Sequence, residues 1–272
     1  MRLISLRDRD AIEVWLRRNA ALHLYELGDL DDFFWPTTTW YGLEKDDAQP
    51  SPLGRVEAVA LLYTATALPV LVVMGDETYL PGVRALLDKL APVLPARFYA
   101  HLLPGSADML ARTFHLEPHG THDRMVLRDR ARLDAVDTSE AVPLGPADEP
   151  ELSAFYAHAY PGHWFEPRML AIGAYFAVRR AGKIASVAGV HVVSRRHRVA
   201  ALGNIATDPA LRGQGLARIA TAAVCRSLAE LDPIGLNVAA DNAAAIALYR
   251  SLGFERTAVY EEHLATAKLV QE

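Results

Sequence analysis

The sequence of 272 residues contains a single cysteine, Cys225. One cysteine cannot form an intramolecular disulfide, which excludes a disulfide-stabilised fold and favours a reducing compartment. The sequence also has no uncharged apolar run of the roughly 20 residues that a membrane-spanning helix needs. Residues 1–10 mix Arg and Asp, whereas a secretory signal peptide needs an apolar segment. We therefore expect a cytoplasmic protein that does not bind a membrane.

The sequence also has no excess of basic residues. The 28 Lys and Arg residues are outnumbered by 33 Asp and Glu residues, which gives a formal net charge of −5. This balance argues against a nucleic-acid partner, because such a partner needs a basic face. A hydrophobic content of 51% with 22% charged residues is typical of a globular chain. The length suits two domains of ordinary size.

Two common phosphate-binding motifs are absent from the stretch 204–217, which has neither the Gly-Lys-Ser/Thr of a P-loop nor a Gly-x-Gly-x-x-Gly. It carries instead the turn Arg212-Gly213-Gln214-Gly215 between an apolar strand at 200–207 and an apolar helix. Glycines there let a ligand approach the backbone. The start of the helix presents unpaired N–H groups and a positive dipole end, and Arg212 adds a charge with forked donors. The turn therefore predicts a site for an anion such as a pyrophosphate.

A second motif follows this turn in the sequence. The strand 235–239 leads into a helix that begins after Asp241-Asn242 and ends near Gly253. Together the two motifs resemble those of the GNAT superfamily of acyl-CoA-dependent N-acyltransferases, and the resemblance covers roughly the second half of the chain. The residues that carry it are Arg212-x-x-Gly215-x-Ala217, Asn242-x-x-Ala245-x-x-Leu248-Tyr249 and Leu252-Gly253-Phe254.

The resemblance implies a binding site for acetyl-CoA. It implies that the strands ending at Thr207 and Ala239 splay apart, with the pantetheine arm paired along the first strand. A backbone N–H near Ile205 or Ala206 would polarise the thioester carbonyl. Asn242 would bind the cofactor, and capping its helix is an equally good use of its side chain. The implied cofactor-binding residues are Ile205, Ala206, Thr207, Arg212, Gly213, Gln214, Gly215, Leu216, Ala217, Asn237, Asn242 and Ala245.

Tyr249 is the candidate general acid. A phenol has an unperturbed pKa of roughly 10, so it stays protonated at neutral pH and can protonate a departing thiolate. The alternative is that Tyr249 is a core aromatic on the apolar face of its helix. Asn204 is the other candidate catalytic residue: it cannot take a proton, but it could position the amine or a water.

The general base is left open by the sequence. Many family members carry a carboxylate on the strand equivalent to 199–207, and this chain has none there. The candidates are His163, Glu166 and His191, or a chain of waters. The aromatic pair Trp164-Phe165 lies in the loop that covers the acceptor site in this family, so it contacts either the substrate or the core. No metal is expected.

The element order of the first half recurs in the second. Helices alternate with apolar strands in the same order in both halves. Leu6 and Leu144 lie 138 positions apart, and Phe114 and Phe254 lie 140 positions apart. This offset predicts a duplicated unit. We expect an α/β fold of two tandem GNAT-like domains, each with a central mixed β-sheet flanked by helices, at residues 1–133 and 137–272.

The first domain is predicted to have no cofactor site. At the same offset, the phosphate turn of the second half corresponds to Gly75-Asp76-Glu77, where acidic side chains would repel a pyrophosphate. The position of Tyr249 corresponds to Met109, which has no proton to donate. The first half is therefore interpreted as a degenerate copy that packs against the active one or shapes the substrate entrance.

The resulting hypothesis is an N-acetyltransferase that uses acetyl-CoA and acts on the amine of a small molecule or amino-acid-like acceptor. A protein N-terminal or lysine acetyltransferase is the alternative among enzymes. An acyl-CoA-binding sensor without turnover is the alternative among other classes, because of the missing strand carboxylate. The sequence predicts neither the acceptor nor the oligomeric state.

Overall fold

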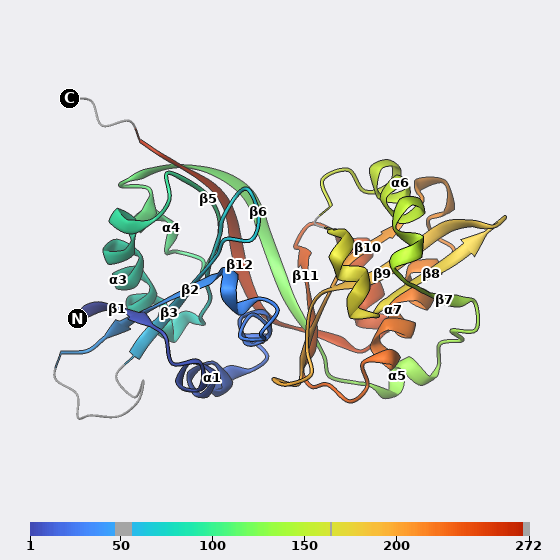
Figure 1. Cartoon of the computed structure of the whole chain (residues 1–272), viewed down its shortest axis with the longest axis horizontal. Coiled ribbons are helices and arrows are strands. Elements are labelled where there is room, and N and C mark those ends of the chain that lie inside the picture. The colour runs from blue at the N-terminus through green and yellow to red at the C-terminus, as the bar shows by residue number, and fades with distance from the viewer. Residues whose placement is uncertain (47–55, 164, 269–272) are drawn as a thin grey trace. The chain divides into compact units, whose positions relative to one another are not determined.

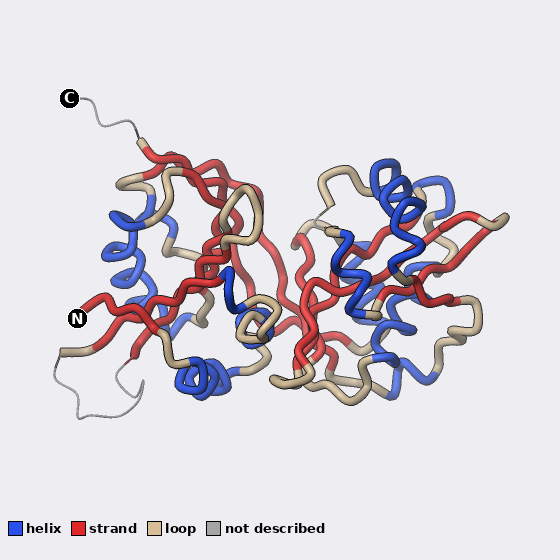
Figure 2. The backbone as a smooth tube through the Cα atoms, viewed as in Figure 1, coloured by secondary structure: helices blue, strands red, loops and turns tan. Residues whose placement is uncertain are grey.

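The computed structural model describes residues 1–46, 56–163 and 165–268 (Figure 1). The chain forms two compact units. Unit 1 contains Met1–Arg124, Ala239–Asp241 and Arg256–Glu272, and unit 2 contains Met125–Val238 and Asn242–Glu255. Both units consist of strands with helices packed on them (Figure 2).

Unit 1 has a sheet with the strand order β1-β2-β3-β4-β5-β12-β6. β4 and β5 pair in parallel, whereas β1 to β4 pair antiparallel in sequence and β12 pairs antiparallel with β5. The strands are β1 Arg2–Leu6, β2 Thr38–Glu44, β3 Val56–Tyr63, β4 Val70–Val73, β5 Arg97–Leu102, β6 Phe114–Leu127 and β12 Phe254–Ala267. The α-helices are α1 Arg9–Leu16, α2 Leu24–Gly28, α3 Leu80–Leu90 and α4 Ala107–Leu110.

Unit 2 has the strand order β11-β10-β9-β8-β7, in which β10 and β11 are parallel and the other pairs are antiparallel. Its strands are β7 Ala141–Leu144, β8 Tyr175–Arg180, β9 Lys183–Ser194, β10 Val199–Thr207 and β11 Ile234–Ala239. Its α-helices are α5 Ala131–Asp134, α6 Glu149–Ala159, α7 Leu216–Ser227 and α8 Ala243–Ser251, and a 3₁₀ segment, η6, covers Pro167–Ile172. The predicted mixed α/β fold is confirmed.

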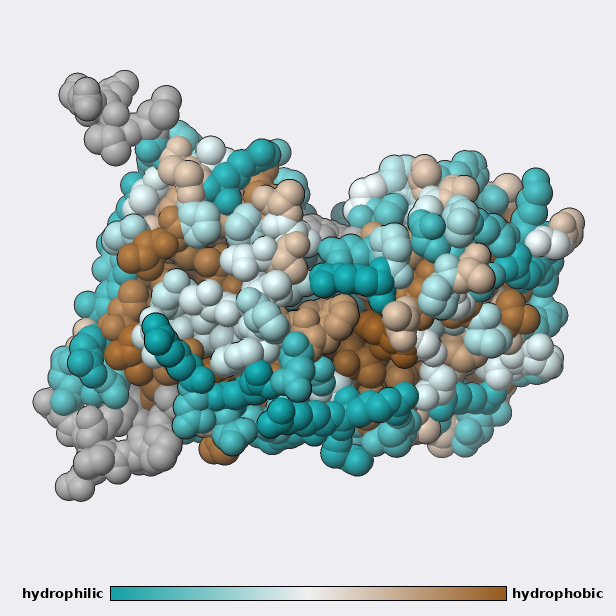
Figure 3. All heavy atoms as spheres, in the orientation of Figure 1, coloured by the Kyte–Doolittle hydropathy of each residue, from teal (hydrophilic) through white to brown (hydrophobic). Residues whose placement is uncertain are grey.

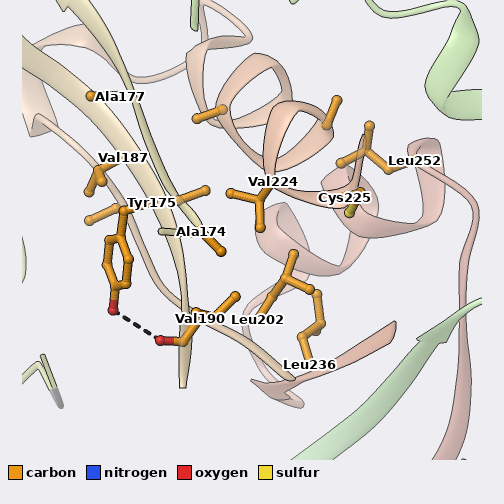
Figure 4. Packing of buried hydrophobic residues seen from close by; sticks show 14 of the residues in the cluster. Ala174, Tyr175, Ala177, Val187, Val190, Leu202, Val224, Cys225, Leu236 and Leu252 are labelled. Atoms are coloured by element: carbon orange, nitrogen blue, oxygen red, sulfur yellow. Dashed lines mark hydrogen bonds between the residues drawn. The ribbon is translucent and has the colours of Figure 1, made fainter. Parts of the chain in front are cut away.

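The core of unit 2 lies between its sheet and the helices α6, α7 and α8. Val224 of α7 packs toward Leu202 and Leu236 of the parallel strand pair (Figure 4). Cys225 lies in the same cluster with 1% of its surface exposed. Burial raises the pKa of its thiol to about 12, so the thiol stays protonated near neutral pH and serves packing rather than chemistry.

The last strand, β12, was not predicted. The sequence analysis placed residues 137–272 in one domain, whereas the structure assigns Arg256–Glu272 to unit 1 and begins unit 2 at Met125. β12 runs beside β5, and Glu262 pairs directly with His101 (Figure 1). Charged side chains interrupt its apolar alternation, and its partner lies more than half the chain away. Neither the strand nor the pairing therefore leaves a local signal.

None of the helices in the described ranges is both long enough and apolar enough to span a bilayer. Hydrophilic side chains are spread over the face drawn in Figure 3, with small apolar areas between them.

Candidate active site

The parallel strands of unit 2 separate at their carboxyl ends. β10 and β11 pair only at Ala200–Leu202 with Ile234–Leu236, although the strands continue to Thr207 and Ala239. No residue pair of these two strands is in register beyond Leu202 and Leu236. This geometry matches the splayed pair that the family resemblance implies, and it leaves room for an extended ligand to pair with β10.

The parallel strands of unit 1 remain closed. All four residues of β4 pair with Tyr99–Leu102 of β5. Two further backbone hydrogen bonds extend the ladder, from Tyr99 N to Pro69 O at 2.8 Å and from Leu103 N to Val73 O at 3.1 Å. No gap for an extended ligand is present between these strands.

A β-bulge interrupts β10 where the strands separate. Gly203 pairs with Gly189 and Ala206 with Val187, so β10 has one more residue than β9 between these pairs. Asn204 adopts a left-handed conformation in the bulge, with φ of +53°. Asn tolerates this conformation better than most residues, and a bulge of this kind changes the direction of a strand.

Two buried tyrosines hold the bulge. The hydroxyl of Tyr156 on α6 donates to the backbone carbonyl of Asn204 at 2.6 Å. The hydroxyl of Tyr175 on β8 donates to the carbonyl of Val190 at 3.0 Å and accepts from Asn204 Nδ2 at 2.9 Å. Figure 4 shows the bond between Tyr175 and Val190. The Oδ1 atom of Asn204 is buried without a hydrogen-bond partner, so it can accept from an amine or a water.

Two glycines make room for aromatic rings on one face of the sheet. A Cβ at Gly189 would lie 2.1 Å from the ring of Tyr175, and a Cβ at Gly203 would lie 1.9 Å from the ring of His191. Because Gly189 and Gly203 are paired, both rings lie on the same face. Burial lowers the pKa of His191 to about 4, so its imidazole is neutral near pH 7.

The loop after α6 packs onto this face. The ring of His163 stacks on Tyr156 with centroids 4.9 Å apart, and its Nδ1 accepts from Phe165 N at 3.1 Å. Burial lowers the pKa of His163. Phe165 is buried and makes an edge contact with Tyr175, so it belongs to the core. Trp164 lies outside the described residues.

Glu166 has a cationic partner. Its carboxylate accepts from Arg168 Nε at 2.5 Å, and the Glu166 side chain is 33% exposed. A paired carboxylate at the surface is a weaker base candidate than the neutral imidazoles.

The glycine turn before α7 is open. Gly213 and Gly215 have φ of +79° and +75°, and a Cβ at either position would meet no atom within 4 Å. Arg212, Gly213, Gln214 and Gly215 are exposed. Gly215 caps α7 without any side-chain hydrogen bond to the first turn, so no capping side chain occupies the N–H groups at the start of the helix. The turn fits a pyrophosphate.

The second motif has a clear structural role. Asn242 caps α8 by accepting from Ala245 N at 3.1 Å. Tyr249 on α8 is buried at 7% exposure and makes an edge contact with Phe254 at 6.0 Å. Asn237, Ile205 and Thr207 are partly exposed on the separated strands, and Thr207 Oγ1 lies 2.8 Å from Ser186 Oγ.

Asn204, His191 and His163 therefore meet on one face, whereas Glu166 is bonded to Arg168. Sequence reasoning missed Tyr156 and Tyr175. Only Gly189 and Gly203 hint at rings packed on the backbone, and the register of the strands is needed to see which rings these are.

We expect Tyr175→Phe to lower the free energy of unfolding by about 1–3 kcal/mol, because it leaves the buried Val190 carbonyl and Asn204 amide without their partner. Denaturant unfolding followed by circular dichroism measures this loss. Tyr160→Phe is the control: Tyr160 is 42% exposed, so the change should stay within about 0.5 kcal/mol. Equal stability of the two variants would contradict the role of Tyr175.

Comparisons with known proteins point to one family. A model of the acetyltransferase (GNAT) family matches residues 142–254. The chain is 37% identical over 119 residues to the ribosomal protein bS18-alanine N-acetyltransferase of Escherichia coli K12, a match covering 40% of this chain and 75% of that enzyme. It is 52% identical over 54 residues to the mycothiol acetyltransferase of Kocuria rhizophila, a match covering 19% of this chain and only 18% of that enzyme.

A solved structure extends the likeness to the whole chain. A tandem GNAT protein from the clavulanic acid biosynthesis pathway superposes with a TM-score of 0.54 at 16% identity and covers 98% of both chains. At this identity the likeness shows the fold alone.

Proposed function

Because the chain belongs to the GNAT acetyltransferase family, we propose that it transfers the acetyl group of acetyl-CoA to the amine of a small molecule or amino-acid-like acceptor. The observation that carries this proposal is the separation of β10 and β11 beside the open glycine turn. In the proposed complex, Ile205 and Thr207 pair with the pantetheine arm. The N–H groups from Arg212 to Ala217 bind the pyrophosphate.

Coenzyme A is proposed to bind unit 2 only. The closed β4–β5 pair supports this assignment. Gly75 is a packing residue, since a Cβ there would lie 3.0 Å from Tyr79 Cβ. The side chain of Asp76 caps a short 3₁₀ segment by accepting from Thr78 N at 2.9 Å, so an acidic group occupies the place where a phosphate would bind. Unit 1 is thus interpreted as a copy that lost its cofactor site.

The chemistry is assigned to few side chains. Tyr249 is proposed to protonate the departing thiolate, and a backbone N–H near Ala206 to polarise the thioester carbonyl. Asn204 is proposed to position the amine through its unpaired Oδ1. His191 is the preferred base, because its imidazole is neutral and lies against Gly203 beside Asn204. A water can relay the proton where the amine does not reach the ring.

A protein acceptor is the second candidate. The Escherichia coli relative is named for acetylating an alanine of a ribosomal protein, which favours a peptide α-amine as the acceptor. A non-catalytic acyl-CoA sensor is the third candidate, because β10 carries no carboxylate.

The test is the release of free coenzyme A thiol from acetyl-CoA with a panel of amines. We expect turnover above the rate of solvent hydrolysis with small primary amines and amino-acid amides. A peptide with an N-terminal alanine, and the same peptide with a blocked N-terminus, distinguish the protein acceptor. A preference of at least tenfold for the free peptide over every small amine would move the assignment to the second candidate. Binding of acetyl-CoA without turnover on any amine would leave the non-catalytic acyl-CoA sensor as the assigned function.

A further inference from the structure

A cluster of polar rings surrounds one carboxylate in unit 1. Glu262 and Tyr260 lie two residues apart on β12, so both side chains are on the same face. His101 on β5 pairs directly with Glu262. The ring of Tyr260 lies 5.0 Å from His101 and is stacked on His122 of β6 at 5.4 Å.

Two phenols donate to the carboxylate. Tyr99 Oη lies 2.6 Å from Glu262 Oε2, and Tyr260 Oη lies 3.0 Å from Oε1. Burial and the bond to Glu262 raise the pKa of Tyr99. Both donors are therefore neutral, and they orient the carboxylate without compensating its charge.

No permanent cation accompanies this carboxylate. Within the part of the chain that the structure describes, no Lys or Arg nitrogen lies within 4 Å of Glu262. The nearby Arg124 is committed to other groups: it donates to the carbonyl of Leu22 and to Glu26 Oε2. Burial raises the pKa of Glu26, but Arg124 and His23 hold it down at about 2. The charge of Arg124 is therefore already paired with the Glu26 carboxylate.

Two imidazole nitrogens face the same carboxylate oxygen. His101 Nε2 lies 3.4 Å and His122 Nδ1 lies 3.6 Å from Glu262 Oε1. Burial lowers the pKa of His101 to about 4, so its ring is neutral near pH 7 and does not compensate the charge of Glu262. His122 Nδ1 is buried without a hydrogen-bond partner. Two imidazole rings and one negative oxygen thus converge.

The cluster is reachable from solvent. The side chains of Glu262, His122 and His101 are 14%, 18% and 21% exposed. His119, which contacts the ring of Tyr99 at 5.3 Å, is 39% exposed. The side chain of Glu262 is therefore partly open to solvent.

We propose that the ring cluster around Glu262 in unit 1 binds a protonated aliphatic amine. An ammonium group has three N–H donors and one positive charge, which suit a carboxylate that has no Lys or Arg partner within 4 Å among the described residues. The rings of Tyr99 and Tyr260 add faces that attract a cation. The described residues hold no group of His, Cys, Asp or Glu arranged for a metal ion, which favours an organic cation over a metal.

The proposal goes beyond the proposed function, since it places a second amine site in unit 1, where the amine acts as an effector of the same chemical class as the acceptor. Binding is measured without acetyl-CoA, so its outcome does not depend on whether the chain acetylates anything. The probe is n-butylamine at pH 7, with 1-butanol as its uncharged match. The readout is the shift of the ring signals of His101 and His122 in NMR spectra of the full chain.

We expect n-butylamine to shift both histidine signals saturably and 1-butanol to leave them unchanged. Glu262→Gln keeps the size of the side chain and removes its charge, so it should raise the Kd of n-butylamine at least tenfold. Glu261→Gln is the matched control. Glu261 is the next residue, points to the opposite face and lies 3.6 Å from His263, so this variant should bind like the parent.

Several results would overturn the proposal: an unchanged Kd in Glu262→Gln, an equal response to 1-butanol, or binding of Zn²⁺ but not of n-butylamine. The comparison of amine and alcohol uses the parent protein, so it decides the matter even if Glu262→Gln does not fold.

Discussion

Gly215→Asp is expected to weaken coenzyme A binding by at least a hundredfold. The new carboxylate would stand at the start of α7, where the open N–H groups are proposed to bind the pyrophosphate. Two like charges about 4 Å apart repel by about 4 kcal/mol at an effective dielectric constant of about 20. The φ of +75° at this position adds backbone strain. Isothermal titration calorimetry with coenzyme A measures the loss.

Gly215→Asn separates the charge from the strain. Asn has the size of Asp and tolerates a positive φ, but it carries no charge, so most of the affinity should remain. Gly182→Asp is a second control, because Gly182 also has a positive φ and open surroundings but lies in the β8–β9 turn. Binding of two coenzyme A molecules per chain, or an unchanged affinity for coenzyme A in Gly215→Asp, would refute the assignment of the site to unit 2.

Tyr249→Phe is expected to lower kcat by about a hundredfold or more while the Kd of acetyl-CoA stays within a few-fold of the parent. The ring and its edge contact with Phe254 remain, and only the proton donor is lost. Protonation of the thiolate occurs only on the reaction path, so the loss should affect kcat rather than binding. Steady-state kinetics together with calorimetry measure the two quantities.

Tyr79→Phe in unit 1 is the matched control, because the ring of Tyr79 also makes an edge contact, with Trp15 at 6.3 Å. It should turn over like the parent. Normal turnover of Tyr249→Phe would return Tyr249 to the alternative role of a core aromatic. A lowered melting temperature in Tyr249→Phe alone would show instead that its hydroxyl is a structural hydrogen-bonding group.

The glycine turn and the helices α7 and α8 could be predicted from the sequence because their signals are local. Gly213 and Gly215 need left-handed dihedrals, and Asn242 stands at a helix start; the structure shows these conformations and the cap. The sequence allows two roles for Asn242, a helix cap and a cofactor contact. The structure shows the cap of α8, and the cofactor contact stays a prediction.

The parts that could not be predicted depend on pairing between distant strands. The β10 bulge at Asn204 needs the register of Gly203 with Gly189, and a sequence pattern does not give register. Tyr156 and Tyr175 leave no signal in the sequence, because their hydroxyl partners are backbone carbonyls. The Glu262 cluster was missed because it depends on the pairing of β12 with the distant strand β5.

The position of β12 also sets the order of events during protein synthesis. Residues 1–124 leave the ribosome before β12, yet their sheet needs β12 beside β5. The edge of β5 therefore waits, unpaired, until β12 has been synthesised, and an exposed strand edge invites pairing with other chains. Slow translation would prolong this interval. The order in which the chain emerges thus makes the first unit, rather than the second, the last to be completed.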